Sequence, residues 1–169
     1  MPEALEFYYY WGVAHYQQDQ KTEAMEVFKK GVRQVGSDSD KNLASDLYSM
    51  LGDLYHTQKL DAEAYAAYDS ALVYNPDNIG ALNNYAYYLS LEKKNLDKAE
   101  EMSYRTVKAE PTNETYLDTY AWILFEKGKY AEARIYIDQA IQNGGNQSSV
   151  VVEHCGDIYY QNGEREKAV

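Results

Sequence analysis

The sequence predicts an all-α fold, built as an array of antiparallel helix-turn-helix repeats, and three observations predict it. With only 3 Pro and 10 Gly in 169 residues, the composition favours helices joined by short turns. A small residue after an aromatic or aliphatic one recurs at steps of 40, 34, 35 and 35 residues, at Gly12, Gly52, Ala86, Ala121 and Gly156. A second small residue follows each of these by about 12 positions, at Ala24, Ala64, Ala99, Ala133 and Ala168.

Because the two markers keep one register, we divide the chain into four whole units and part of a fifth, within one domain of residues 1–169. The units span residues 5–38, 45–78, 79–113, 114–147 and 149–169. About six extra residues, 39–44, are expected to lead into the second unit, and one extra residue is expected within 92–95. The fifth unit should hold its first helix alone.

Elementary packing explains the small residues. Gly or Ala at the eighth position of a unit, with Ala at the twentieth, lets the two helices of that unit cross closely. Pro76 and Pro111 should end the second helices of units two and three, because proline donates no N–H and its ring clashes with the preceding turn.

These positions resemble the tetratricopeptide repeat, whose 34-residue pattern runs W-x2-L-G-x2-Y, then A, F, A and P. The second unit carries the resemblance best, with Tyr48, Leu51, Gly52, Tyr55, Ala64, Tyr68, Ala71 and Pro76 in order. The resemblance implies a right-handed α-solenoid that binds another protein or peptide. It extends to the repeat arrays of bacterial, Bacteroidetes-like proteins. Since each repeat buries its apolar face against its neighbours, we expect a fragment of a longer array.

In tetratricopeptide arrays the first helices line the concave face, and positions 2, 5, 9, 12 and 13 of each unit point into it. The resemblance therefore implies a partner-binding face. Its candidate residues are Glu6, Tyr9, Tyr16, Asp46, Asp53, His56, Asn83, Tyr87, Asp118, Trp122, Phe125, Glu126, Glu153, Asp157 and Tyr160. Of all 25 such positions, seven are Asp or Glu and none is Lys or Arg, which predicts an acidic, aromatic-lined groove. Alternatively, an acidic protein carries an acidic face everywhere.

The same positions indicate the kind of partner. One class of these repeats binds acidic chaperone tails through a basic clamp, but no unit here has Lys at position 2 or 5. Acidic side chains would repel a carboxylate, whereas aromatic faces attract Arg and Lys. A basic or mixed apolar protein or peptide is therefore predicted. A formal charge of -11 opposes binding to nucleic acid.

The sequence offers no catalytic residues, no cofactor motif and no metal site. His15, His56 and His154 fall on three different predicted helices without the i, i+4 spacing of a helical metal site, so we interpret them as structural. The single Cys155 excludes only an internal disulfide. No apolar run is long enough to insert in a membrane. The compartment stays open between a bacterial cytoplasm and a periplasm or cell envelope reached with a leader or lipid anchor.

Two alternatives to a groove-binding scaffold remain. The unfinished fifth unit and the aromatic residues 7–11 fit an assembly module that self-associates through exposed repeat ends. The array could also regulate an enzyme encoded elsewhere in the full chain. Whether the groove or the convex face binds the partner is left open at this point.

Overall fold

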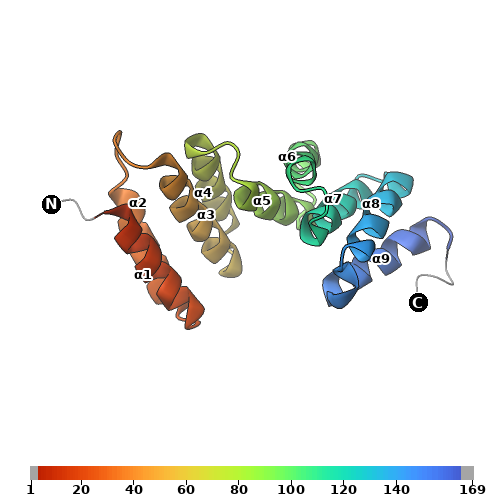
Figure 1. The fold of residues 1–169 in the computed structure, drawn as a ribbon, viewed down its shortest axis with the longest axis horizontal. Coiled ribbons are helices and arrows are strands. Elements are labelled where there is room, and N and C mark those ends of the chain that lie inside the picture. The colour runs from red at the N-terminus through yellow and green to blue at the C-terminus, as the bar shows by residue number, and fades with distance from the viewer. Residues whose placement is uncertain (1–3, 165–169) are drawn as a thin grey trace. The chain divides into compact units, whose positions relative to one another are not determined.

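The computed structural model describes residues 4–164. The chain groups into two compact units that are each larger than one repeat: unit 1, residues 1–81, and unit 2, residues 82–169. Helices, turns and one short 3₁₀ helix make up the described residues, in which no strand occurs (Figure 1). The all-α class predicted from the sequence is therefore confirmed.

Unit 1 contains two antiparallel helix pairs. Helices α1 (Leu5–Gln17) and α2 (Lys21–Arg33) form the first pair, and α3 (Lys41–Thr57) and α4 (Asp61–Tyr74) form the second. Helix α2 also contacts α3, which joins the pairs (Figure 1). Fully buried side chains such as Phe28, Leu47 and Leu54 fill the space between the helices. Helix α5 (Ile79–Leu91) begins at the end of this unit and continues in the next.

The two helices of each pair in unit 1 meet at a glycine. A Cβ added to Gly12 on α1 would lie 2.3 Å from Cε1 of Phe28 on α2. A Cβ added to Gly52 on α3 would lie 2.7 Å from Cε1 of Tyr68 on α4. Both aromatic rings are fully buried, so they have no free space to move into. The glycines are thus the points of closest approach that the spacing of small residues predicts.

Helix α3 starts earlier than the sequence predicts. We expected residues 39–44 as a lead-in, but α3 begins at Lys41 and includes the last four of them. The reason is Asp40, whose Oδ1 accepts a hydrogen bond from the backbone N–H of Leu43 at 2.9 Å and so caps the helix. The spacing of repeats in the sequence cannot reveal a local capping hydrogen bond of this kind.

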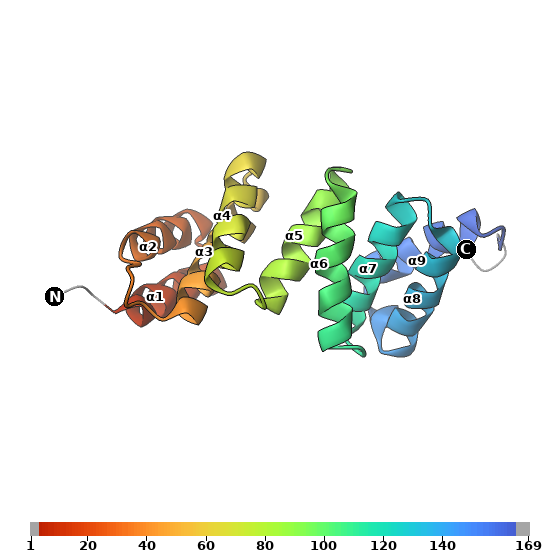
Figure 2. The same cartoon turned by 90° about the horizontal axis from the view of Figure 1, so that it is seen from above.

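Unit 2 contains most of α5, then α6 (Leu96–Ala109), α7 (Glu114–Glu126), α8 (Tyr130–Gln142), the 3₁₀ helix η1 (Gly145–Gln147) and α9 (Ser149–Gln161). Helix α7 contacts α6, α8 and α9, and α8 contacts α9 (Figures 1 and 2). The core of this unit includes Leu117, Leu124, Ile137 and Ile158, each almost fully buried. Helices α7 and α9 thus lie against the same partner, α8.

The turns within pairs follow one plan with one exception. Three residues separate α1 from α2, α3 from α4 and α7 from α8, but four, residues 92–95, separate α5 from α6. This turn holds the extra residue that the spacing predicts. Asp19, Lys59, Lys93 and Gly128 have φ of 59°, 60°, 54° and 78°, and the longer turn adds Asn95 at 43°. Only Gly128 adopts this left-handed conformation without steric cost.

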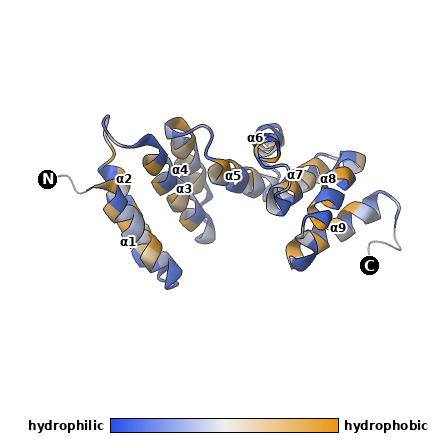
Figure 3. Cartoon of the chain, in the orientation of Figure 1, coloured by the Kyte–Doolittle hydropathy of each residue, from blue (hydrophilic) through white to orange (hydrophobic). Residues whose placement is uncertain are grey.

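The helices carry mixed hydropathy along their lengths, with hydrophilic and hydrophobic residues alternating on each ribbon (Figure 3). Among residues 4–164, none of the helices combines the length and the apolar character that crossing a bilayer requires. The sequence-based marker Ala168 of the fifth repeat lies outside the described residues.

Candidate functional site

The predicted partner-binding residues all lie on the first helix of a pair, or on α9. In unit 1 they lie on α1 and α3, and in unit 2 on α5, α7 and α9. Their environments differ, and the difference decides where a site can form.

In unit 1 the acidic candidates on α3 are engaged within the protein. Asp53 accepts a hydrogen bond from the hydroxyl of Tyr68, and Asp46 accepts one from Nδ2 of Asn78 at 3.0 Å. Burial raises the pKa of Asp46, the charge of Asp40 adds to the rise, and the bond from Asn78 opposes it. These two carboxylates therefore attach α3 to α4 and to the turn that follows α4.

The remaining candidates of unit 1 are divided between surface and core. Glu6 and Tyr16 are exposed, whereas Tyr9 is partly buried and packs against the core of the unit. His56 lies on α3 with its Nδ1 at 3.7 Å from Oδ1 of Asp61 on α4.

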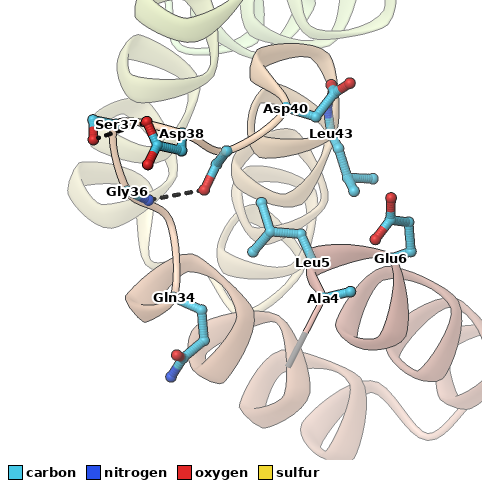
Figure 4. Close-up of a pocket in the computed structure, with 10 residues that line it drawn as sticks. Ala4, Leu5, Glu6, Gln34, Gly36, Ser37, Asp38, Asp40 and Leu43 are labelled. Atoms are coloured by element: carbon cyan, nitrogen blue, oxygen red, sulfur yellow. Dashed lines mark hydrogen bonds between the residues drawn. The ribbon is translucent and has the colours of Figure 1, made fainter. Parts of the chain in front are cut away.

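A cavity of about 410 Å³ does lie in unit 1, between the start of α1 and the loop that joins α2 to α3 (Figure 4). Glu6 is the single predicted residue that lines it. The polar groups of the loop bind one another, since Gly36 N donates to Oγ of Ser39 at 2.9 Å and Asp40 caps α3. The polar groups of this loop thus serve to connect α2 to α3.

Unit 2 contains a buried pair of side chains from two different repeats. Nδ1 of His154 on α9 lies 2.9 Å and 3.0 Å from the two carboxylate oxygens of Asp118 on α7. A carboxylate oxygen only accepts, so Nδ1 carries the proton of this hydrogen bond. Both side chains are 8% exposed. The pair fixes α9 against α7 and places a carboxylate inside the unit.

Aromatic side chains extend from this pair along the same face. The ring of Trp122 stacks on His154 with centroids 4.0 Å apart, and it stacks on Phe125 at 4.7 Å. The ring centroid of Tyr87 on α5 lies 6.4 Å from that of His154. Nε1 of Trp122 is buried and has no hydrogen-bond partner among residues 4–164. We call the surface made by Asn83, Tyr87, Asp118, Trp122 and His154 the α5–α7–α9 face.

A cavity of about 460 Å³ opens on this face, and we call it the unit 2 pocket. Helix α5 contributes Asn83, Asn84 and Tyr87, helix α7 contributes residues of its first two turns, and the segment from Gly144 to Val151 closes the third side. Thr115 and Val150 are exposed and form its rim. Two consecutive repeats and the start of α9 therefore build one pocket.

Asn83 is the most unusual lining residue. It is only 5% exposed, its Nδ2 donates to Oδ1 of Asn84 at 3.3 Å, and its Oδ1 has no hydrogen-bond partner among residues 4–164. An unpaired buried acceptor costs about 1–3 kcal/mol of stability. Most buried polar atoms in proteins are paired, so this exception calls for an explanation.

The electrostatic environment of this face is negative. Burial raises the pKa of Tyr87, and the charges of Asp118 and Glu153 raise it further. The predicted residues Glu153, Asp157 and Tyr160 on α9 are exposed. One predicted acid is not available to a partner, because Oε2 of Glu126 lies 3.2 Å from Nζ of Lys93 and the Glu126 side chain is only 10% exposed. Of the acids predicted to contact a partner, Asp46 and Asp53 in unit 1 and Asp118 and Glu126 in unit 2 are thus engaged within the protein.

Sequence reasoning missed several residues of this site. His154 was interpreted as structural, and it packs inside unit 2 against two of the candidates, Asp118 and Trp122, a contact that the sequence did not predict. Glu114 and Asn84 line the pocket although the repeat positions carried over did not include them. One signal was available for the asparagines: Asn83 and Asn84 stand in mid-helix, where asparagine is a poor helix former.

Among residues 4–164, no group of three or more His, Cys, Asp or Glu side chains could hold a metal ion. Burial raises the pKa of the Cys155 thiol, and the charges of Asp138 and Asp118 raise it further. Since the thiolate is the nucleophile of cysteine chemistry, this environment disfavours a reactive cysteine.

Comparison with known proteins connects the fold to a repeat family. A sequence model described as tetratricopeptide repeat matches residues 45–78 and 115–143. The TPR repeat-containing protein PA4667 of Pseudomonas aeruginosa is 29% identical over 140 residues, which cover 82% of this chain. The same alignment covers 22% of that relative, so the chain spans about a fifth of its length.

Solved structures share the arrangement of helices. MamA (residues 41 to the end) from Desulfovibrio magneticus RS-1 superposes with a TM-score of 0.80 at 14% identity, covering 98% of this chain and 89% of that one. The structure of pilF from Pseudomonas aeruginosa superposes with a TM-score of 0.78 at 22% identity, covering 98% of this chain and 72% of that one. At these identities the likeness is one of fold.

Proposed function

We propose that this chain, two segments of which match the tetratricopeptide repeat, is a protein-interaction scaffold that binds a peptide segment of a partner protein on the α5–α7–α9 face. The scaffold acts without catalysis. The segment lies across the unit 2 pocket and the aromatic side chains beside it. Extended segments and helices are the ligands that helical grooves accept.

The unit 2 pocket is the observation that carries this proposal. Its volume of about 460 Å³ is within the range of about 300–1,000 Å³ typical of ligand sites. Tyr87 lines it, Trp122 stacks on His154, and aromatic side chains of this kind dominate the energetics of protein interfaces. A buried hydrogen-bonded pair, Asp118 and His154, keeps the floor of the face rigid before any partner arrives.

The charge of the face favours a basic or mixed apolar segment. Glu153 and Asp157 are exposed on α9, and they would attract Lys and Arg while repelling a carboxylate. An acidic tail of the kind that chaperones present is a poor ligand for this surface. The preference applies to unit 2, where the pocket lies.

Peptide selection tests the proposal. The whole 169-residue protein is immobilised, and a phage-displayed library of random dodecapeptides is selected on it. The best peptides are then titrated against Val150→Arg, which blocks the rim of the pocket, and against Ile135→Arg as a matched control. Val150 is 46% exposed and Ile135 on α8 is 55% exposed, so both variants should fold.

We expect Val150→Arg to weaken binding at least tenfold and Ile135→Arg to leave it unchanged. If no peptide is enriched over an unrelated immobilised protein, the chain does not bind segments in this way. Equal loss in both variants, or loss in Ile135→Arg alone, would place binding on another surface and contradict the proposal.

Self-association is the second candidate function, and one observation favours it. Phe7, Tyr10 and Trp11 on α1 are 51%, 69% and 40% exposed, an aromatic patch that fits contact with another helical repeat. If this patch makes a dimer, light scattering gives twice the chain mass, and a triple serine variant returns it to a monomer. A monomer at all concentrations tested would contradict this second function.

A further inference from the structure

The unpaired acceptor of Asn83 indicates what the unit 2 pocket binds. Asn83 lines the pocket from α5, is 5% exposed, and leaves its Oδ1 without a partner among the described residues. Nδ2 of the same amide donates a hydrogen bond to Oδ1 of Asn84 at 3.3 Å. A ligand that donates a hydrogen bond would satisfy the acceptor. The χ2 torsion of asparagine is soft, so a small rotation presents Oδ1 to the cavity.

The charges around the pocket select among possible donors. Neither Lys nor Arg is among the lining residues, whereas two carboxylates, Glu114 and Asp118, are. Both carboxylate oxygens of Asp118 lie within hydrogen-bond distance of Nδ1 of His154, so Glu114 is the carboxylate left to face a ligand. A positively charged donor gains more here than a neutral one, because hydrogen bonds to charged groups are about twice as strong.

An anion is the competing ligand, because the N-termini of α7 and α9 border the pocket and helix N-termini attract negative charge. Both termini are already capped. Oδ1 of Asn113 accepts from the N–H groups of Thr115 and Tyr116 at 3.1 Å, and Oγ of Ser148 accepts from Val151 N at 3.4 Å. An anion would therefore meet occupied donors and the Glu114 carboxylate.

The geometry points to a subsite for one cationic side chain, Arg or Lys, of the bound segment. Oδ1 of Asn83 accepts a hydrogen bond from the guanidinium or ammonium group, Glu114 supplies the opposite charge, and the ring of Tyr87 contacts the cation. Aromatic rings attract such cations over their faces. This inference rests on the proposed function and adds to it the residue type that the pocket recognises.

A double-mutant cycle tests the subsite with dodecapeptides selected on the whole protein. In the best peptide each Arg or Lys is replaced in turn by Gln, and each peptide is titrated against wild type, Asn83→Leu and Glu114→Gln. Glu132→Gln, an exposed acid on α8, is the matched control for loss of charge. Asn83→Leu removes an unpaired acceptor, so we expect its melting temperature to be retained or raised.

We expect one basic residue of the peptide to matter at least tenfold for wild type and about threefold or less for Asn83→Leu and Glu114→Gln. Glu132→Gln should behave as wild type. If peptides bind and Val150→Arg abolishes binding, but no basic residue is coupled to Asn83 or Glu114, the subsite is wrong and the proposed function stands. If no peptide binds at all, both are overturned.

Discussion

The close approach of α1 and α2 leads to a prediction about the substitution Gly12→Ala. The added Cβ would lie 2.3, 2.6 and 2.7 Å from three carbons of the Phe28 ring. Real Cβ atoms essentially never come within 3.0 Å of such neighbours, so the buried Phe28 ring, or the helix that carries it, must shift. The fold of the first pair thus depends on the missing side chain.

Two opposing terms decide the magnitude. Alanine gains about 1 kcal/mol over glycine in a helix interior, while forcing an extra methyl into a packed core costs about 1–3 kcal/mol. The distance of 2.3 Å is far inside van der Waals contact, so the cost belongs at the upper end of that range. The net result is a destabilisation of about 2 kcal/mol, or about 4–8 °C in Tm for a domain of this size.

Gly80→Ala is the matched control, because Gly80 is helical in α5 and an added Cβ would meet only Oδ1 of Asn78, at 3.7 Å. Its Tm should stay unchanged or rise by a few degrees. Thermal unfolding followed by circular dichroism measures both variants. If Gly12→Ala is as stable as Gly80→Ala, α1 and α2 do not cross at Gly12 and the account of the helix pair is wrong.

Three further predictions concern unit 2. Asn113→Ala removes the N-cap of α7 and should cost about 1 kcal/mol in urea unfolding; no change would mean that the cap is not formed. Asp118→Leu leaves the buried His154 without its acceptor and should cost about 3 kcal/mol in the same assay, whereas a loss below about 1 kcal/mol would contradict a buried pair. The hydrogen bond to Asp138, with burial, raises the pKa of Tyr159 from 10.0 to about 12. The stability from this phenol is complete below pH 10 and is lost as pH rises through 12, so the free energy of unfolding should fall across that window less steeply in Tyr159→Phe than in wild type.

The repeat architecture follows from the sequence because it depends on local periodicity. Gly12 and Gly52 were identified by spacing alone, and both lie where two helices touch. The extra residue within 92–95 was identified in the same way. The early start of α3 was missed, since it depends on the capping hydrogen bond of Asp40 and not on the repeat.

The candidate site was predictable only in part, for a physical reason. Positions carried over from a repeat family place Tyr87, Asp118 and Trp122 on one face, and the structure brings them together around His154. The pairing itself joins residues 36 positions apart, and no pattern within one repeat contains it. The burial of Asn83 likewise depends on neighbours from other helices.

Photo-crosslinking tests most directly the claim that the α5–α7–α9 face binds a peptide segment. A selected dodecapeptide carrying benzoylphenylalanine in place of one residue is irradiated on the whole protein, and the labelled residues are identified by peptide mapping. The account predicts labels on α5, α7 and the start of α9, around Tyr87, Thr115 and Val150. Labels confined to α6 and α8 would contradict it.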